Sequence, residues 1–85
     1  MKDLARQLKA VANERRLKIL VLLKKGGMWT VSDIADAIKL SIRSTSRHLQ
    51  LLKQAGLLED TQSGACVYYR PCKDHPVYKI VSNLI

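Results

Sequence analysis

The spacing of apolar positions predicts four helices in the first 55 residues of the chain. From 2 to 12, apolar residues recur every three or four positions. A second helical segment runs from the N-cap Asn13 to about residue 25, and apolar residues occupy almost every side of it. An all-round apolar segment is typical of a central core helix. A capping box over 30–33 begins a short third helix, and Ser41 can cap a fourth that ends near Ala55.

After Gly56 the pattern changes to that of a hairpin followed by a helix. Two short runs, 57–61 and 65–70, flank a polar tip, and apolar residues return at helical spacing from about 77. Helix, helix, helix, turn, helix, hairpin, helix is the order of a winged helix-turn-helix. The chain is therefore predicted to be mainly α with a small β-hairpin (α+β), in a single domain over 1–85.

Packing roles are also predicted for the aromatic residues. Trp29 follows a Gly-Gly pair and is expected to plug the core between the second and third helices. Strand alternation predicts that Val67 and Tyr69 point inward and Tyr68 outward.

The net charge narrows the class of partner. Fifteen Lys and Arg against seven Asp and Glu give a charge of +8 in 85 residues, which favours a polyanion: nucleic acid first, an anionic membrane surface second. The longest apolar run, 19–23, is far shorter than the ~20 residues of a bilayer span. The first residues lead into a charged helical pattern without a signal-peptide core, and two cysteines suit a reducing compartment. We therefore expect a cytoplasmic protein with no membrane partner.

The fourth predicted helix has two dissimilar faces. At about 100° per residue, Ile42, Thr45, Leu49 and Leu52 fall together and are expected to face the core. The opposite stripe holds no acid and no large apolar side chain; it consists of Arg43, Ser46, Arg47, Gln50 and Gln54. Arg can bind guanine bidentately and Gln can bind adenine, and the second helix of a helix-turn-helix enters the major groove. The alternative is an ordinary solvated helix face.

Further polar residues around this helix extend the candidate DNA-binding set. Ser44 and His48 flank the reading stripe and are expected to meet phosphates, while Lys39 and Arg70 could add contacts to the DNA backbone. The tip at 61–65 has no Lys or Arg, so wing contacts should be weak or uncharged. The complete set is Lys39, Ser41, Arg43, Ser44, Ser46, Arg47, His48, Gln50 and Arg70.

Several segments together resemble the ArsR/SmtB family of winged-helix repressors. They are ANERRLKIL (12–20), VSDIA (31–35), SRHL (46–49), LKQAGL (52–57), and Gly64 followed by VYYR (67–70). The resemblance implies a homodimeric repressor that binds an operator, here expected to be an inverted repeat. It also implies a dimer interface formed by the first and last helices, 1–12 and 75–85. Positions 43, 44, 46, 47 and 50 match the family's recognition-helix positions.

The apolar residues of the two end helices are predicted to form that dimer interface. They exceed what one small winged-helix core can cover, and two protomers could bury them against each other. The residues are Leu4, Leu8, Val11, Val77, Ile80, Val81 and Leu84.

The chain departs from the family at its metal-sensing motifs. Thr30 and Ser32 occupy the positions of a Cys-x-Cys motif that many members carry at the third helix, and only His75 falls near a position of their C-terminal zinc site. Lys39 replaces a Gly that is usual before the recognition helix. We therefore expect no metal and no cofactor.

The remaining chemistry of the chain is sparse. Cys66 and Cys72 lack zinc-site spacing and are predicted to lie too far apart for a disulfide, although a redox or small-molecule effector stays open. No catalytic set can be assembled, so an enzyme is not expected. Two other functions compete with that of a sequence-specific repressor: a winged-helix protein-interaction module and a nonspecific architectural DNA-binding protein.

Overall fold

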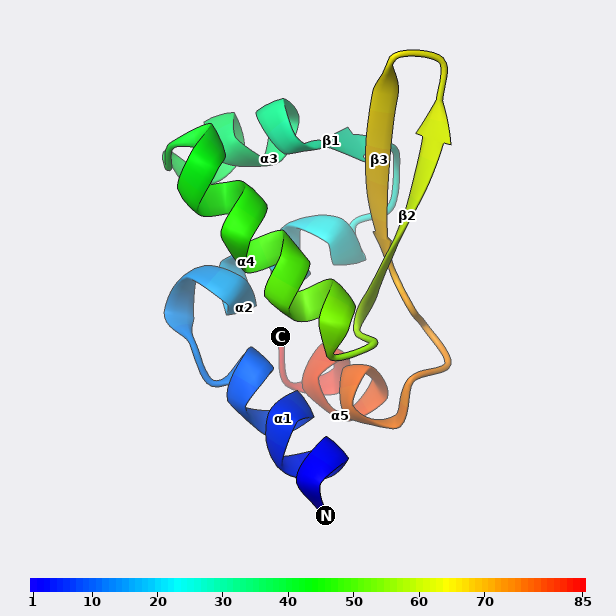
Figure 1. Ribbon diagram of the computed structural model, residues 1–85. Helices are drawn as coiled ribbons and strands as arrows, with labels where there is room; N and C mark the ends of the chain where they lie inside the picture. The colour runs from blue at the N-terminus through cyan, green and yellow to red at the C-terminus, as the bar shows by residue number, and fades with distance from the viewer.

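Five helices and three short strands make up the computed structural model, which describes residues 1–85 (Figure 1). They are α1 (Lys2–Val11), α2 (Glu14–Lys24), β1 (Trp29–Thr30), α3 (Val31–Ile38), α4 (Ile42–Gln54), β2 (Leu58–Ser63), β3 (Cys66–Pro71) and α5 (Pro76–Leu84). Helices α3 and α4 form the helix-turn-helix, and β2 and β3 form the wing beside it (Figure 1). The predicted α+β winged helix-turn-helix is confirmed.

Side-chain caps begin three of the helices where the sequence predicts them. The Asn13 side chain accepts a hydrogen bond from the backbone N–H of Arg16 at the start of α2. Thr30 and Asp33 form both halves of a capping box at α3. Ser41 Oγ accepts from the N–H of Ser44 at 3.1 Å and starts α4. These bonds satisfy N–H groups that have no partner within the helix.

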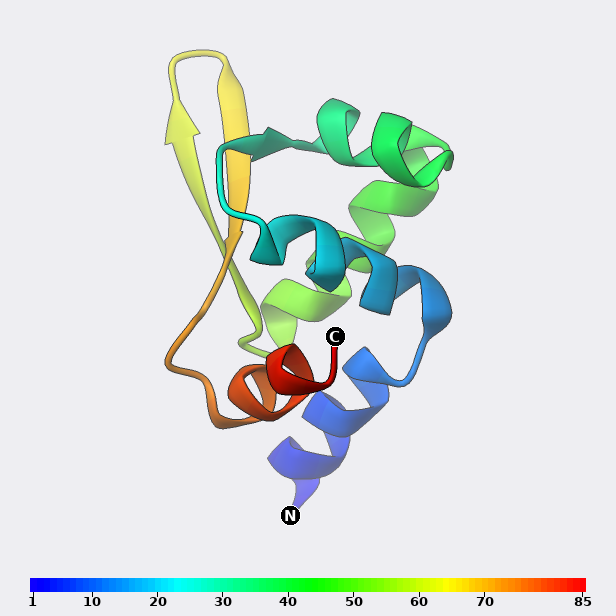
Figure 2. The ribbon, with the colours of Figure 1, turned by 180° about the vertical axis from the view of Figure 1, so that it is seen from behind.

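Helix α2 is the centre of the hydrophobic core. Figure 2 shows it running between α3 and α5. Its Ile19, Leu20 and Leu23 are almost fully buried, and they share one cluster with Leu49 and Leu52 of α4. The core therefore holds the second helix of the helix-turn-helix directly against the central helix.

The sheet contains one strand more than the sequence predicts. Its order is β1-β3-β2, with Trp29 opposite Tyr69 and Thr30 opposite Tyr68. Trp29 is half-buried and packs against the core, while its indole N–H donates to the carbonyl of Gly26 at 2.9 Å. The prediction of a core plug is thus met, but the residue also belongs to a strand.

The packing of β3 agrees with the predicted strand alternation. Tyr69 is buried and Val67 packs against the core, as expected. Tyr68 is not among the residues packed against the core, in agreement with its predicted outward direction, and it is half-buried beside Thr30 of β1.

The predicted inward face of α4 is wrong at one position. Ile42 remains 58 % exposed, whereas Thr45, Leu49 and Leu52 are fully buried. Ile42 is the first residue of α4, and the helix begins before it reaches the layer of core side chains.

The apolar residues of the end helices divide into two groups. Val11, Val77 and Val81 are buried within the protomer, so their assignment to a dimer surface needs correction. The exposed residues of the predicted interface are Leu4, Leu8, Ile80 and Leu84. Helices α1 and α5 lie next to each other (Figures 1 and 2), with both chain ends in that region. No helix is both long and apolar enough to cross a membrane.

Candidate nucleic-acid interface

The outer face of α4 presents two arginines with no protein partner. Arg43 and Arg47 are exposed, and neither makes an ion pair or a side-chain hydrogen bond. Their i, i+4 spacing places them on the same side of the helix, opposite the buried Thr45 and Leu49. Two unpaired guanidinium groups on a helix held by the core can bind base edges or phosphates.

Gln50 lies on the same face but is held by the wing. Its Nε2 donates to Tyr69 Oη at 3.2 Å, which joins α4 to β3. Its amide oxygen keeps its acceptor capacity. Ser46, one turn nearer the start of α4, belongs to the same stripe and is half-buried. The reading stripe therefore contains two unpaired side chains, Arg43 and Arg47, and one side chain, Gln50, that is bonded to the sheet.

The turn between α3 and α4 holds Lys39 in a strained conformation. Lys39 has φ 57° and ψ 49°, and it is the one non-glycine residue with a positive φ. Its side chain is exposed, immediately before α4. Ser41, in contrast, uses its hydroxyl as the cap acceptor for the N–H of Ser44. Lys39 thus supplies a charge next to the reading stripe, whereas Ser41 acts first as a cap.

The predicted backbone contact of Arg70 meets a competing interaction. Its guanidinium pairs with the carboxylate of Glu59, the residue opposite it on β2. Lys53 of α4 pairs with Asp60 of the same strand at 2.9 Å, and this contact raises the pKa of Lys53. Both acids of the wing therefore neutralise nearby cations, and the tip carries no charge of its own.

The His48 side chain of α4 contacts Arg16 of α2, so it is not free to meet a phosphate as predicted. Its Nδ1 lies 3.2 Å from Arg16 Nη1. Burial lowers the pKa of His48, and the nearby charges of Arg16, Arg15 and Arg47 lower it further. A neutral imidazole that accepts from Arg16 is the state that these surroundings favour.

Arg16 is a structural residue that the sequence did not reveal. Its Nε donates to the carbonyl of Ala10 at 2.6 Å and its Nη2 to the carbonyl of Lys9 at 3.4 Å. It therefore caps the end of α1 while it binds His48 of α4. No local pattern predicts such a bond, because the two residues are far apart in sequence.

The positions that carry the metal-sensing motifs in the family hold residues with other roles here. Thr30 Oγ1 accepts the N–H of Asp33 as a helix cap, and no group of three His, Cys, Asp or Glu side chains comes together to hold a metal ion. Both cysteines are free thiols. Burial, and then the charge of Glu59, raise the pKa of Cys72, which makes its thiolate scarcer.

Comparisons with known proteins agree with this geometry. The model of the family described as "Bacterial regulatory protein, arsR family" matches residues 13–60. The transcriptional repressor SdpR of Bacillus subtilis is 46 % identical over 61 residues, which cover 72 % of this chain and 67 % of that protein. The arsenical resistance operon repressor of Escherichia coli is 44 % identical over 62 residues, which cover 73 % of this chain and 53 % of that protein. The matched segment thus spans about half to two thirds of these relatives.

A solved structure extends the similarity to almost the whole chain. It is the homodimeric winged helix-turn-helix DNA-binding domain (fragment 1–100) of Mb0332 from Mycobacterium bovis. The two share 37 % identity with a TM-score of 0.87, over 98 % of this chain and 75 % of that one.

Proposed function

Since this chain belongs to the arsR family of bacterial regulatory proteins, we propose that it binds an inverted-repeat operator as a homodimer and represses transcription. Its partners are double-stranded DNA and a second copy of itself. A cytoplasmic location accords with this function.

The unpaired arginines of α4 are the observation that carries the proposal. Arg43 and Arg47 are exposed and free of ion pairs, on a helix whose opposite face buries Thr45, Leu49 and Leu52. A bidentate contact from one of them to guanine would contribute about 1–3 kcal/mol of discrimination. Lys39 adds a sequence-independent phosphate contact, whereas Arg70 is first committed to Glu59.

The exposed apolar side chains of the end helices support a dimer. These residues lie on adjacent helices and remain 42–79 % exposed in the protomer: Leu4 and Leu8 of α1, and Ile80 and Leu84 of α5. A two-fold interface would bury this patch on both copies at once. In such a dimer the two copies of α4 should lie about 34–36 Å apart, one turn of DNA.

Random-oligonucleotide selection on the purified protein tests the proposal. We expect one inverted repeat, with half-site centres about 10 base pairs apart. The double variant Arg43→Ala/Arg47→Ala should lose this preference, while Lys73→Ala, in the exposed loop between β3 and α5, should bind like the parent. Unchanged operator binding by the double variant would remove the reading face. Recovery of no preferred sequence would instead favour an architectural protein, and no duplex binding at all would favour an interaction module.

We further propose that the DNA complex does not respond to metal through the family's usual sites. The hydroxyl groups of Thr30 and Ser32 are poor zinc ligands, and Thr30 is committed to its cap. Titration with zinc, cadmium and arsenite should leave operator affinity unchanged. Stoichiometric zinc binding that lowers this affinity and disappears in His75→Ala would contradict the proposal.

A further inference from the structure

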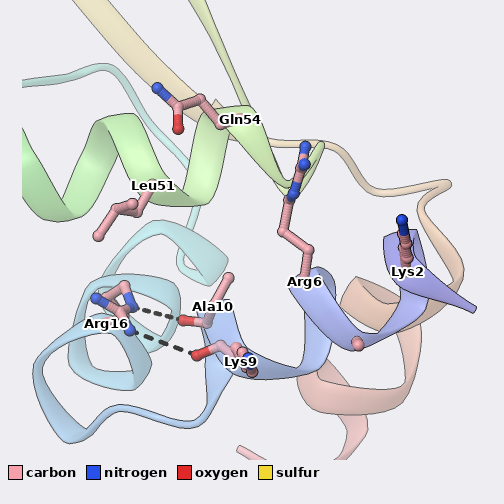
Figure 3. Close-up of a pocket in the computed structure, with 8 residues that line it drawn as sticks. Lys2, Arg6, Lys9, Ala10, Arg16, Leu51 and Gln54 are labelled. Atoms are coloured by element: carbon pink, nitrogen blue, oxygen red, sulfur yellow. Dashed lines mark hydrogen bonds between the residues drawn. The ribbon is translucent and has the colours of Figure 1, made fainter.

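A cationic pocket lies between α1 and the last two turns of α4, away from the reading stripe. It encloses about 780 Å³, and its charged lining consists of Lys2, Arg6, Lys9 and Arg16. Figure 3 shows Arg6 extending from α1 toward the end of α4, and Leu51 extending from α4 toward Arg16. No acidic residue lines the pocket.

The cations that line this pocket make no ion pair within the protein. Lys2, Arg6 and Lys9 follow one another at i, i+4 and i+7 on α1, and none makes an ion pair or donates a side-chain hydrogen bond. Like charges at i, i+4 repel each other and weaken a helix. A bound anion would relieve this repulsion.

Arg16 places a pre-oriented guanidinium at the inner wall. Three of its five N–H groups are directed at Ala10, Lys9 and His48. These bonds fix its plane and leave two N–H groups for another acceptor. A side chain already held in place loses little freedom when a ligand binds.

The floor of the pocket is apolar, which distinguishes it from a simple phosphate contact. Ala5 and Ala10 of α1 and Leu51 of α4 contribute this floor, and Leu51 remains 39 % exposed. A DNA phosphate placed against these apolar side chains would lose hydration without gaining a hydrogen bond from them. A hydrocarbon chain or ring would cover them, while its acidic group met the cations.

The pocket also stays accessible in the proposed dimer. On α1, the stripe of Lys2, Arg6 and Lys9 lies on the side of the helix opposite Leu4 and Leu8, as the 100° step per residue requires. A partner subunit that covered the leucines would leave the cations open.

We propose that this pocket binds an organic anion, in which a carboxylate, sulfonate or phosphate group is attached to an apolar body. Arg6, Lys9 and Arg16 bind the acidic group, and Ala5, Ala10 and Leu51 pack against the body. The site belongs to the DNA-free protein, so its test does not depend on operator binding.

Titration of the DNA-free protein with decanoate, followed by amide NMR shifts, tests the site. We expect the shifts to concentrate at the lining residues Ala5, Arg6, Lys9, Ala10, Leu51 and Gln54. Arg6→Gln should weaken binding roughly tenfold through the loss of one charge-assisted hydrogen bond. Leu51→Gln should weaken it roughly threefold through lost apolar contact. Lys73→Gln, which removes an exposed charge outside the pocket, should bind like the parent. Inorganic sulfate should bind at least roughly tenfold more weakly than decanoate, because it has no apolar body.

Three results would overturn the proposal. Shifts confined to the exposed Leu4 and Leu8 would place decanoate on the apolar patch instead. Equal affinity for sulfate and decanoate would remove the role of the floor. If decanoate caused no shifts while Arg6→Gln reduced binding to duplex DNA, the cations would belong to the DNA interface.

Discussion

Replacing Lys39 by glycine should move stability and DNA affinity in opposite directions. Lys39 occupies the left-handed region at φ 57°, where the side chain of an L-residue costs about 1–2 kcal/mol. Glycine removes this strain, but it also widens the unfolded ensemble by about 0.4–1 kcal/mol. The net gain in unfolding free energy should be about 0.5–1 kcal/mol, or a few degrees in Tm for a domain of this size.

The same substitution removes the charge in the turn just before α4. If Lys39 contacts a phosphate, its loss should weaken binding to all sequences alike and reduce the slope of log K against log[salt] by about one unit per protomer. Lys39→Ala serves as the matched control, because it removes the charge but keeps a Cβ at the strained position. Lys39→Ala should therefore bind DNA like Lys39→Gly and unfold at or below the parent's midpoint.

Urea unfolding at a fixed protomer concentration and fluorescence anisotropy at several salt concentrations measure the two effects. Equal stability of the Gly and Ala variants would show that the turn stores no strain. A salt slope unchanged in both variants would remove Lys39 from the DNA interface.

Three further predictions concern the core, the Arg16–His48 contact and the dimer. Thr45→Val should raise the unfolding free energy by about 1–2 kcal/mol, because Thr45 Oγ1 is fully buried without a hydrogen-bond partner; a loss of stability in urea unfolding would mean that the hydroxyl is bonded. Burial and the charge of Arg16 lower the pKa of His48 from 6.5, so the folded state takes up its proton at lower pH than the unfolded state. Unfolding free energy should be level above about pH 6.5 and fall as the pH drops toward the folded pKa, a slope that must be absent in His48→Gln. Leu8→Glu or Ile80→Glu should shift sedimentation toward monomer, and a parent-like dimer in both would exclude this surface.

Most of the fold follows from periodicity and caps. Asn13, Thr30 and Ser41 mark helix starts through bonds to residues three positions away, which a sequence displays directly. Strand β1 escapes prediction because two residues carry no alternation and their partners, Tyr68 and Tyr69, are distant in sequence.

The sequence predicts the part of the candidate site that lies on α4, but not the contacts between separate elements. The spacing along α4 identifies which residues turn outward, and the structure leaves Arg43 and Arg47 free on that face. The pairs Arg70–Glu59 and Arg16–His48 depend on how separate elements pack. These tertiary contacts determine which Arg and Lys side chains are already bonded within the protein.

The position of Thr30 has a mechanical consequence for the operator. Thr30 pairs with Tyr68 of the wing and also caps α3, while Gln50 bonds Tyr69 from α4. These contacts join the wing to α4, so in the proposed DNA complex we expect a mismatch between protein and duplex to be absorbed by bending of the DNA. Smooth bending of a 20–30 base-pair site by 40–90° costs about 1–6 kcal/mol, depending on its sequence. Flexible pyrimidine–purine steps at positions that the protein never touches should therefore distinguish one operator from another.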